Sequence, residues 1–73
     1  MDQLMEILGS IRPDLDFENQ DRLIDDKLLD SFSIISIISE INVVFDININ
    51  AADILPENFN SVDAIWRLIE SYI

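Results

Sequence analysis

A chain of 73 residues is long enough for one domain, which we expect to span residues 1–73. It contains neither cysteine nor histidine, so disulfides and cysteine-based metal sites are excluded and apolar packing must stabilise the fold. The net charge of −11, from 15 acidic and 4 basic residues, repels nucleic acid and anionic lipid, because both attract basic surfaces.

The first predicted helix covers residues 1–12 and is followed by Pro13. Its apolar residues recur with the spacing of one helix face and comprise Leu4, Met5, Ile7, Leu8 and Ile11. Pro13 ends the helix, because proline disfavours helical backbone in the residue before it.

Residues 13–29 form an acidic, irregular segment, and a connection of this length in a small domain needs a reason. Its apolar side chains, which we expect to attach it to the core, are Phe17, Leu23, Ile24, Leu28 and Leu29.

The same segment has part of the pattern of a calcium-binding loop. Oxygen-bearing side chains occur near the ligand positions of such a loop, namely Asp14, Asp16, Glu18, Gln20 and Asp25. However, Asn19 stands where the sharp turn needs glycine, and the last ligand is a short Asp25 instead of a glutamate. We therefore predict no EF-hand and no functional metal site.

A second helix is predicted from Asp30 or Ser31 to about Phe45, because both aspartate and serine are good N-caps. Its inner face is expected to consist of Ile34, Ile38, Ile41 and Phe45, flanked by Ile35 and Ile37. Its opposite face contains Ser33, Ser36, Glu40 and Val43. That face is nearly uncharged, which is unusual in so acidic a chain.

The stretch FDININ, residues 45–50, alternates apolar and polar residues, as a strand does. No second stretch offers a pairing partner, so we interpret it as an extended connector with two isoleucines turned inward.

A short helix over residues 51–55 is expected next, capped by Asn50 and ended by Pro56. Asn60 or Ser61 caps the last helix, whose inner face comprises Val62, Ile65, Ile69 and Tyr72. The predicted fold is all-α, with three longer helices and one short third helix.

Ser31 is the residue whose role most needs an explanation. A nucleophilic serine requires a general base, usually a histidine or a suitably tuned lysine. The chain has no histidine, and its one lysine, Lys27, lies among Asp25, Asp26 and Asp30, where acidic neighbours make a lysine a poorer base. So small a domain also offers little room for a pocket that excludes water. We therefore predict that the chain is not an enzyme.

Two interpretations of Ser31 remain from its local setting. Serine is a common N-cap, and local features alone favour that role. A helix N-terminus also presents unpaired N–H groups and the positive end of the helix dipole, which favour a phosphoester. Because a long loop meets a rigid helix here, an enzyme could reach the hydroxyl. These features alone do not separate a cap from an attachment point.

The residues around Ser31 resemble a known attachment site. LLDSFS, followed by an apolar helix, is similar to the site of acyl and peptidyl carrier proteins, whose hallmark is Asp-Ser-Leu or a close variant. The resemblance extends through LIDDKLLDSFSIISIISEINVVFDININAADILPENFNSVDAIWRLI in the order of attachment serine, helix, connector, short third helix and closing helix. It implies an acyl-carrier-like four-helix bundle, a single carrier domain.

In that family, the serine matching Ser31 bears 4′-phosphopantetheine, installed from coenzyme A by a separate phosphopantetheinyl transferase that uses Mg²⁺. The resemblance implies that the thiol of this arm holds an acyl or aminoacyl group as a thioester. Further implied partners are an adenylating ligase or acyltransferase that loads the arm and a downstream acceptor enzyme. Ser31 then needs no base from its own chain.

Details of the sequence favour one branch of this family. Phe32 in place of leucine, and the stretch SEINVVFDI, are closest to D-alanyl carrier proteins; stand-alone peptidyl carriers share some of these features. Fatty-acid carriers place several acids on the outer face of the second helix, where this chain has Ser33, Ser36, Asn42 and Val43. Lys27 stands where the family often has glycine, so we expect the turn into Leu28 to differ in shape.

The expected recognition residues are Asp30, Phe32, Ser36, Glu40, Val43 and Ile54. Asp30 would orient the transferase or cap the helix, and the others would form a patch beside the arm. Core packing is the competing role for Phe32 and Ile54.

An alternative function needs no modification at all. The chain could be an acidic helical adaptor that binds partners through its second helix. In either case no signal peptide or membrane-spanning stretch is evident, so we expect a soluble, cytoplasmic monomer. The acidity then serves solubility alone, or it steers the protein onto basic patches of partner enzymes.

Overall fold

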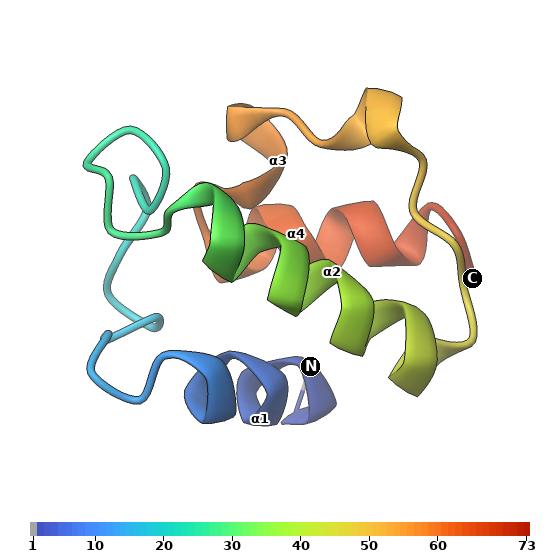
Figure 1. The fold of residues 1–73 in the computed structure, drawn as a ribbon, viewed down its shortest axis with the longest axis horizontal. Helices are drawn as coiled ribbons and strands as arrows, with labels where there is room; N and C mark the ends of the chain where they lie inside the picture. Colours follow the sequence, from blue (N-terminus) through green and yellow to red (C-terminus); the bar gives the residue numbers. More distant parts are fainter. Residues whose placement is uncertain (1) are drawn as a thin grey trace.

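The computed structural model describes residues 2–73, and over that range it is all-helical, with no strand (Figure 1). The α-helices are α1 (Asp2–Ile11), α2 (Ser31–Phe45), α3 (Pro56–Phe59) and α4 (Val62–Glu70), and a 3₁₀ turn, η1, covers Ala51–Asp53. α1 packs against α2 and α4, and α3 packs against α4. The prediction of three longer helices and one short one is confirmed. None of the helices among residues 2–73 has the length and apolarity needed to cross a membrane.

The core is apolar and draws on every α-helix as well as the long loop. Its most deeply buried side chains are Leu4, Leu8, Leu23, Ile37, Ile41, Phe59, Ile65 and Ile69. Full burial of one such side chain stabilises the fold by about 1.5–3 kcal/mol. No buried side-chain nitrogen or oxygen among residues 2–73 lacks a hydrogen-bond partner, so apolar packing is not offset by unpaired polar groups.

The loop between α1 and α2 is attached to the core as predicted. Phe17, Leu23 and Leu29 are buried, and Ile24 and Leu28 are half-buried against the same core. Hydrogen bonds add a second attachment, to the turn between α3 and α4. The N–H of Leu23 donates to the carbonyl of Asn60 at 2.9 Å, and the Asn60 side-chain oxygen accepts from the N–H groups of Ile24 and Asp25.

Asn60 is therefore committed to the loop, and Ser61 is the N-cap of α4, accepting from the N–H of Ala64 at 3.1 Å. The inner face of α4 contains the predicted Val62, Ile65 and Ile69, together with Leu68, which we did not predict. Tyr72 lies beyond the end of the helix and is half-buried.

The turn before Leu28, which we expected Lys27 to alter, has a backbone conformation that glycine adopts readily. Lys27 has φ 59°, the left-handed conformation that favours glycine. Leu28 donates its N–H to the carbonyl of Leu23 and Lys27 donates to Ile24, at 2.9 and 3.0 Å. This pair of bonds is the Schellman pattern that ends a helical turn. The bonds hold the backbone in the glycine-type conformation although the residue is a lysine.

The short third helix begins at Pro56, whereas we predicted that Pro56 would end it. Proline fits the first helical position, because its fixed φ suits a helix and its missing N–H would be unpaired there. Leu55, the residue before it, is extended, as proline requires. Asn50 caps a helical turn as predicted, but that turn is only the 3₁₀ turn η1.

The connector after α2 forms no strand, and its two isoleucines are turned inward as predicted, with Ile49 buried and Ile47 half-buried. The Asn42 side-chain oxygen accepts from the N–H of Ile49 at 3.0 Å, which joins the connector to α2. Further along, the Tyr72 hydroxyl accepts from the N–H of Asn50 and donates to the carboxylate of Asp53. These hydrogen bonds attach the connector to α2 at Ile49 and to Tyr72 at Asn50 and Asp53.

Candidate functional site

Ser31 is the first residue of α2 and is exposed to solvent. The residue that caps α2 is Asp30, which is extended at φ −93° and ψ 176°. Its carboxylate accepts from the N–H of Ser33 at 2.8 Å, and its carbonyl accepts from the N–H of Ile34 at 3.0 Å. Because aspartate performs the capping, the Ser31 hydroxyl is free of that role, and within residues 2–73 it forms no hydrogen bond. The interpretation of Ser31 as the N-cap is wrong.

The local field at Ser31 combines a carboxylate with a helix N-terminus. The pKa of Asp30 is lowered, first by the hydrogen bond from the Ser33 N–H, then by the Ser33 hydroxyl, and further by the charge of Arg12. Asp30 is therefore ionised at neutral pH. Within residues 2–73, the N–H groups of Ser31 and Phe32 have no acceptor. An exposed hydroxyl beside two such donors, at the positive end of α2, suits a phosphoester on Ser31.

Three large apolar side chains on α2 are well exposed: Phe32, Ile35 and Val43. We call the surface that they form with the half-buried Ser36 and the exposed Ser39 and Glu40 the exposed α2 face. Phe32 is 79% exposed, Val43 80% and Ile35 62%. Glu40 is the only charged residue in α2. Such a group of exposed apolar side chains on a strongly acidic protein is typical of an interaction surface. The competing core role of Phe32 is excluded by its exposure.

Two residues of α2 lie on the opposite side from that expected. Ser33 is buried, whereas we placed it on the outer face, and Ile35 is exposed, whereas we placed it beside the core. The buried face of α2 includes Ile37 and Ile41. At about 100° per residue, Ser33 falls on that face, four residues before Ile37, whereas Ile35 lies about 200° from Ile37. Ile34 lies against the core, and Ile35 is turned into solvent.

Ile54 lies between η1 and α3 and is 39% exposed. It belongs to an apolar hollow of about 140 Å³ lined by Ile24, Ile34, Ile54, Leu55, Pro56 and Phe59. The structure therefore brings Ile54 next to the first turns of α2 through Ile34. Leu55, which is 43% exposed, is a neighbour that sequence reasoning missed; its position before Pro56 was the available signal.

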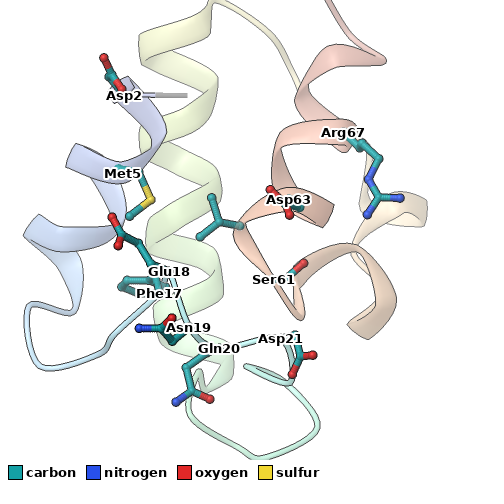
Figure 2. A pocket seen from close by; sticks show the side chains of 11 residues that line it. Asp2, Met5, Phe17, Glu18, Asn19, Gln20, Asp21, Ser61, Asp63 and Arg67 are labelled. Carbon is teal, nitrogen blue, oxygen red and sulfur yellow. The ribbon is translucent and has the colours of Figure 1, made fainter.

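A larger hollow of about 680 Å³ lies between α1, the long loop and the start of α4 (Figure 2). Its carboxylates belong to Asp2, Glu18, Asp21 and Asp63, and Figure 2 shows them spread around the hollow without a common point. Within residues 2–73 no group of three acids, histidines or cysteines is arranged to hold a metal ion. Its one serine, Ser61, already caps α4. The more distinctive chemistry is therefore at Ser31.

No protein-family model, no curated protein sequence and no solved structure matches this chain. Arguments about function therefore rest on the residues around Ser31 and on the surfaces next to it.

Proposed function

We propose that this protein is a thioester carrier with an acyl-carrier-like fold, in which Ser31 bears 4′-phosphopantetheine. The observation that carries the proposal is that Asp30, and not Ser31, caps the 15-residue helix α2, so the hydroxyl of the exposed Ser31 is not used as a cap. The sequence DSF at this position supports it further, because Asp30 and Ser31 then have separate roles as cap and attachment point.

The modification is a phosphoryl-group transfer. The Ser31 oxygen forms a bond to the phosphorus next to the pantetheine of coenzyme A, and the bond from that phosphorus to the bridging oxygen breaks. Adenosine 3′,5′-bisphosphate leaves, and the serine proton passes to a base of the transferase. The transferase also supplies the Mg²⁺ that stabilises charge on the phosphates. This chain contributes the accessible hydroxyl, the helix N-terminus and the surface that the transferase binds.

The exposed α2 face is the proposed recognition surface for the transferase and for the enzymes that load and unload the arm. Phe32, Ser36 and Val43 lie on one side of α2, with Glu40 at its edge and Ile54 across the apolar hollow. Because apolar side chains dominate this face, we propose that partners bind it mainly by packing. The remaining acidic surface would steer partners with basic patches toward it.

The size of the apolar hollow favours a small cargo. Cavities of about 150 Å³ with aliphatic walls hold a ligand the size of benzene, and the hollow of about 140 Å³ beside Ile54 is similar. A long acyl chain left in water costs about 0.8 kcal/mol per methylene. We therefore favour an aminoacyl group, such as D-alanyl, or a peptidyl group over a long fatty acyl chain.

Mass spectrometry of the intact protein tests the proposal. After incubation with coenzyme A, Mg²⁺ and a promiscuous phosphopantetheinyl transferase, the wild type should gain one phosphopantetheine group. Ser31→Ala should gain none, whereas Ser71→Ala, which replaces an exposed serine at the end of α4 and outside the exposed α2 face, should gain one. If transferases that modify an established carrier leave the wild type unchanged, the proposal is wrong and the unmodified adaptor becomes the better account.

A further inference from the structure

Arg12 connects the end of α1 to the segment that leads into Ser31. Its Nη1 donates to the carbonyl oxygen of Leu28 at 2.9 Å, between residues 16 positions apart. Its Nε and Nη2 donate to the two carboxylate oxygens of Asp14 at 3.1 and 3.0 Å. Such a bidentate pair fixes the orientation of a guanidinium group, and the Arg12 side chain is only 29% exposed. The Leu28 carbonyl therefore has a rigid anchor.

The same guanidinium affects the charge next to the attachment point. Its positive charge is one of the causes that lower the pKa of Asp30, after the hydrogen bonds with Ser33. A phosphodiester on Ser31 adds a negative charge to the residue that follows Asp30. Because neighbouring like charges repel each other, a cation acting on Asp30 reduces the electrostatic cost of modifying Ser31.

We propose that Arg12 is a positioning residue for the modification of Ser31: it holds the Leu28–Ser31 segment in the geometry that the transferase recognises and compensates for negative charge there. The inference rests on the proposed function, but it concerns a residue outside the sequence that resembles the carrier site. Arg12 acts through Leu28 and Asp30, and it does not contact the reacting atoms.

Arg22 provides a matched control in the same loop. Its Nε donates to the carboxylate of Asp26 at 3.1 Å, so it also forms an arginine–aspartate pair. Its side chain is 61% exposed, and within residues 2–73 its guanidinium bonds no backbone carbonyl. Replacing either arginine by glutamine makes the same change in net charge, but only Arg12→Gln removes an anchor of the segment before Ser31.

Steady-state kinetics of the transferase, with this protein as the varied substrate, test the role of Arg12. We expect Arg12→Gln to raise KM about tenfold relative to Arg22→Gln with kcat nearly unchanged, because fewer molecules hold the recognised geometry before binding. Arg12→Lys keeps the positive charge, so its KM should lie between those of the wild type and Arg12→Gln. Arg12→Lys also provides a folded test case if Arg12→Gln does not fold.

Two further measurements do not depend on turnover. In the unmodified protein, amide hydrogen exchange at Leu29 and Ser33 should be faster in Arg12→Gln than in Arg22→Gln. Attachment of the arm should also lower the midpoint of thermal unfolding more in Arg12→Gln than in the wild type, because the added negative charge is no longer compensated.

The outcomes separate this inference from the proposed function. If the wild type is modified and Arg12→Gln matches Arg22→Gln in KM, kcat and amide exchange, the role of Arg12 is overturned and the carrier function stands. If the wild type gains no phosphopantetheine, the proposed function is overturned, and a role of Arg12 in modification falls with it.

Discussion

At the residue scale, the start of α2 depends on a division of roles between Asp30 and Ser31. Both residue types are good N-caps, so sequence alone left the capping residue open. The extended backbone of Asp30 and its bond to the Ser33 N–H decide the question. Ser31 then occupies the first helical position, where it is exposed and where its hydroxyl forms no hydrogen bond within residues 2–73.

The ionised carboxylate of Asp30 leads to a prediction about pH. Its pKa is lowered in the folded protein, so its contribution to stability is present above the unfolded value of about 3.9 and is lost as the pH falls through the lower folded pKa. Asp30→Asn keeps a good capping side chain without the charge. The thermal midpoint of the wild type should therefore exceed that of Asp30→Asn at pH 7. The difference should begin to shrink as the pH falls below about 4, and it should vanish only once the pH is below the lowered pKa of the folded protein. An undiminished difference at acid pH would contradict this account.

The left-handed backbone at Lys27 leads to a second prediction at this scale. A residue with a Cβ atom is strained in this conformation, whereas glycine is not. Lys27→Gly should raise the free energy of unfolding by about 0.5–1 kcal/mol in urea denaturation. Lys27→Ala keeps the Cβ atom and is the control, for which we expect no gain. Equal free energies of unfolding for Lys27→Gly and Lys27→Ala would show that the left-handed backbone at this position does not destabilise the fold.

At the element scale, α2 has two isoleucines of opposite roles two positions apart. Ile37 is fully buried, and Ile35 is 62% exposed. Ile37→Ala should reduce the free energy of unfolding by about 2–5 kcal/mol, because it removes buried methyl groups and leaves a cavity. Ile35→Ala should change it by less than about 0.5 kcal/mol. Chemical denaturation followed by circular dichroism measures both, and similar losses in the two variants would place Ile35 in the core.

The helices also show why sequence predicts some elements better than others. For the start of α4, the sequence left two candidate caps, Asn60 and Ser61, because both residue types cap well. Ser61 is the cap, since the Asn60 side chain instead bonds the N–H of Ile24 in the distant loop. The predicted role of Pro56 was wrong, because proline is common both just after the end of a helix and at the first position of a helix. The spacing of apolar residues identified most of the inner face of α2. It did not predict that Ser33 is buried and Ile35 exposed, because these positions depend on how α2 packs against the other elements.

At the scale of the whole molecule, the net charge of −11 opposes folding through self-repulsion. Increasing NaCl from about 0.05 M to about 0.5 M shortens the screening length to a few ångströms. The thermal midpoint should therefore rise over this range. Glu18→Lys, an exposed position in the long loop, reduces the net charge and should give a smaller rise. A midpoint that falls with salt would contradict a role for self-repulsion.

The candidate site was predictable where it depends on local sequence, and it was not where it depends on contacts across the fold. DSF before an apolar helix indicated Ser31, and the place of Val43 on the helix indicated that it is exposed. The exposure of Phe32 was left open by the sequence and was decided by the structure. Arg12 was missed, because its bond to Leu28 joins distant parts of the chain and follows no spacing rule. The apolar hollow beside Ile54 was missed for the same reason, since three separate segments form it.

Locating the added group on the chain tests the central proposal most directly. Trypsin should release residues 28–67 as one peptide, since Lys27 and Arg67 flank it without an internal lysine or arginine. After treatment with coenzyme A and the transferase, fragment ions of this peptide should assign the phosphopantetheine group to Ser31. Assignment of the group to another serine, or an unmodified peptide, would contradict the account.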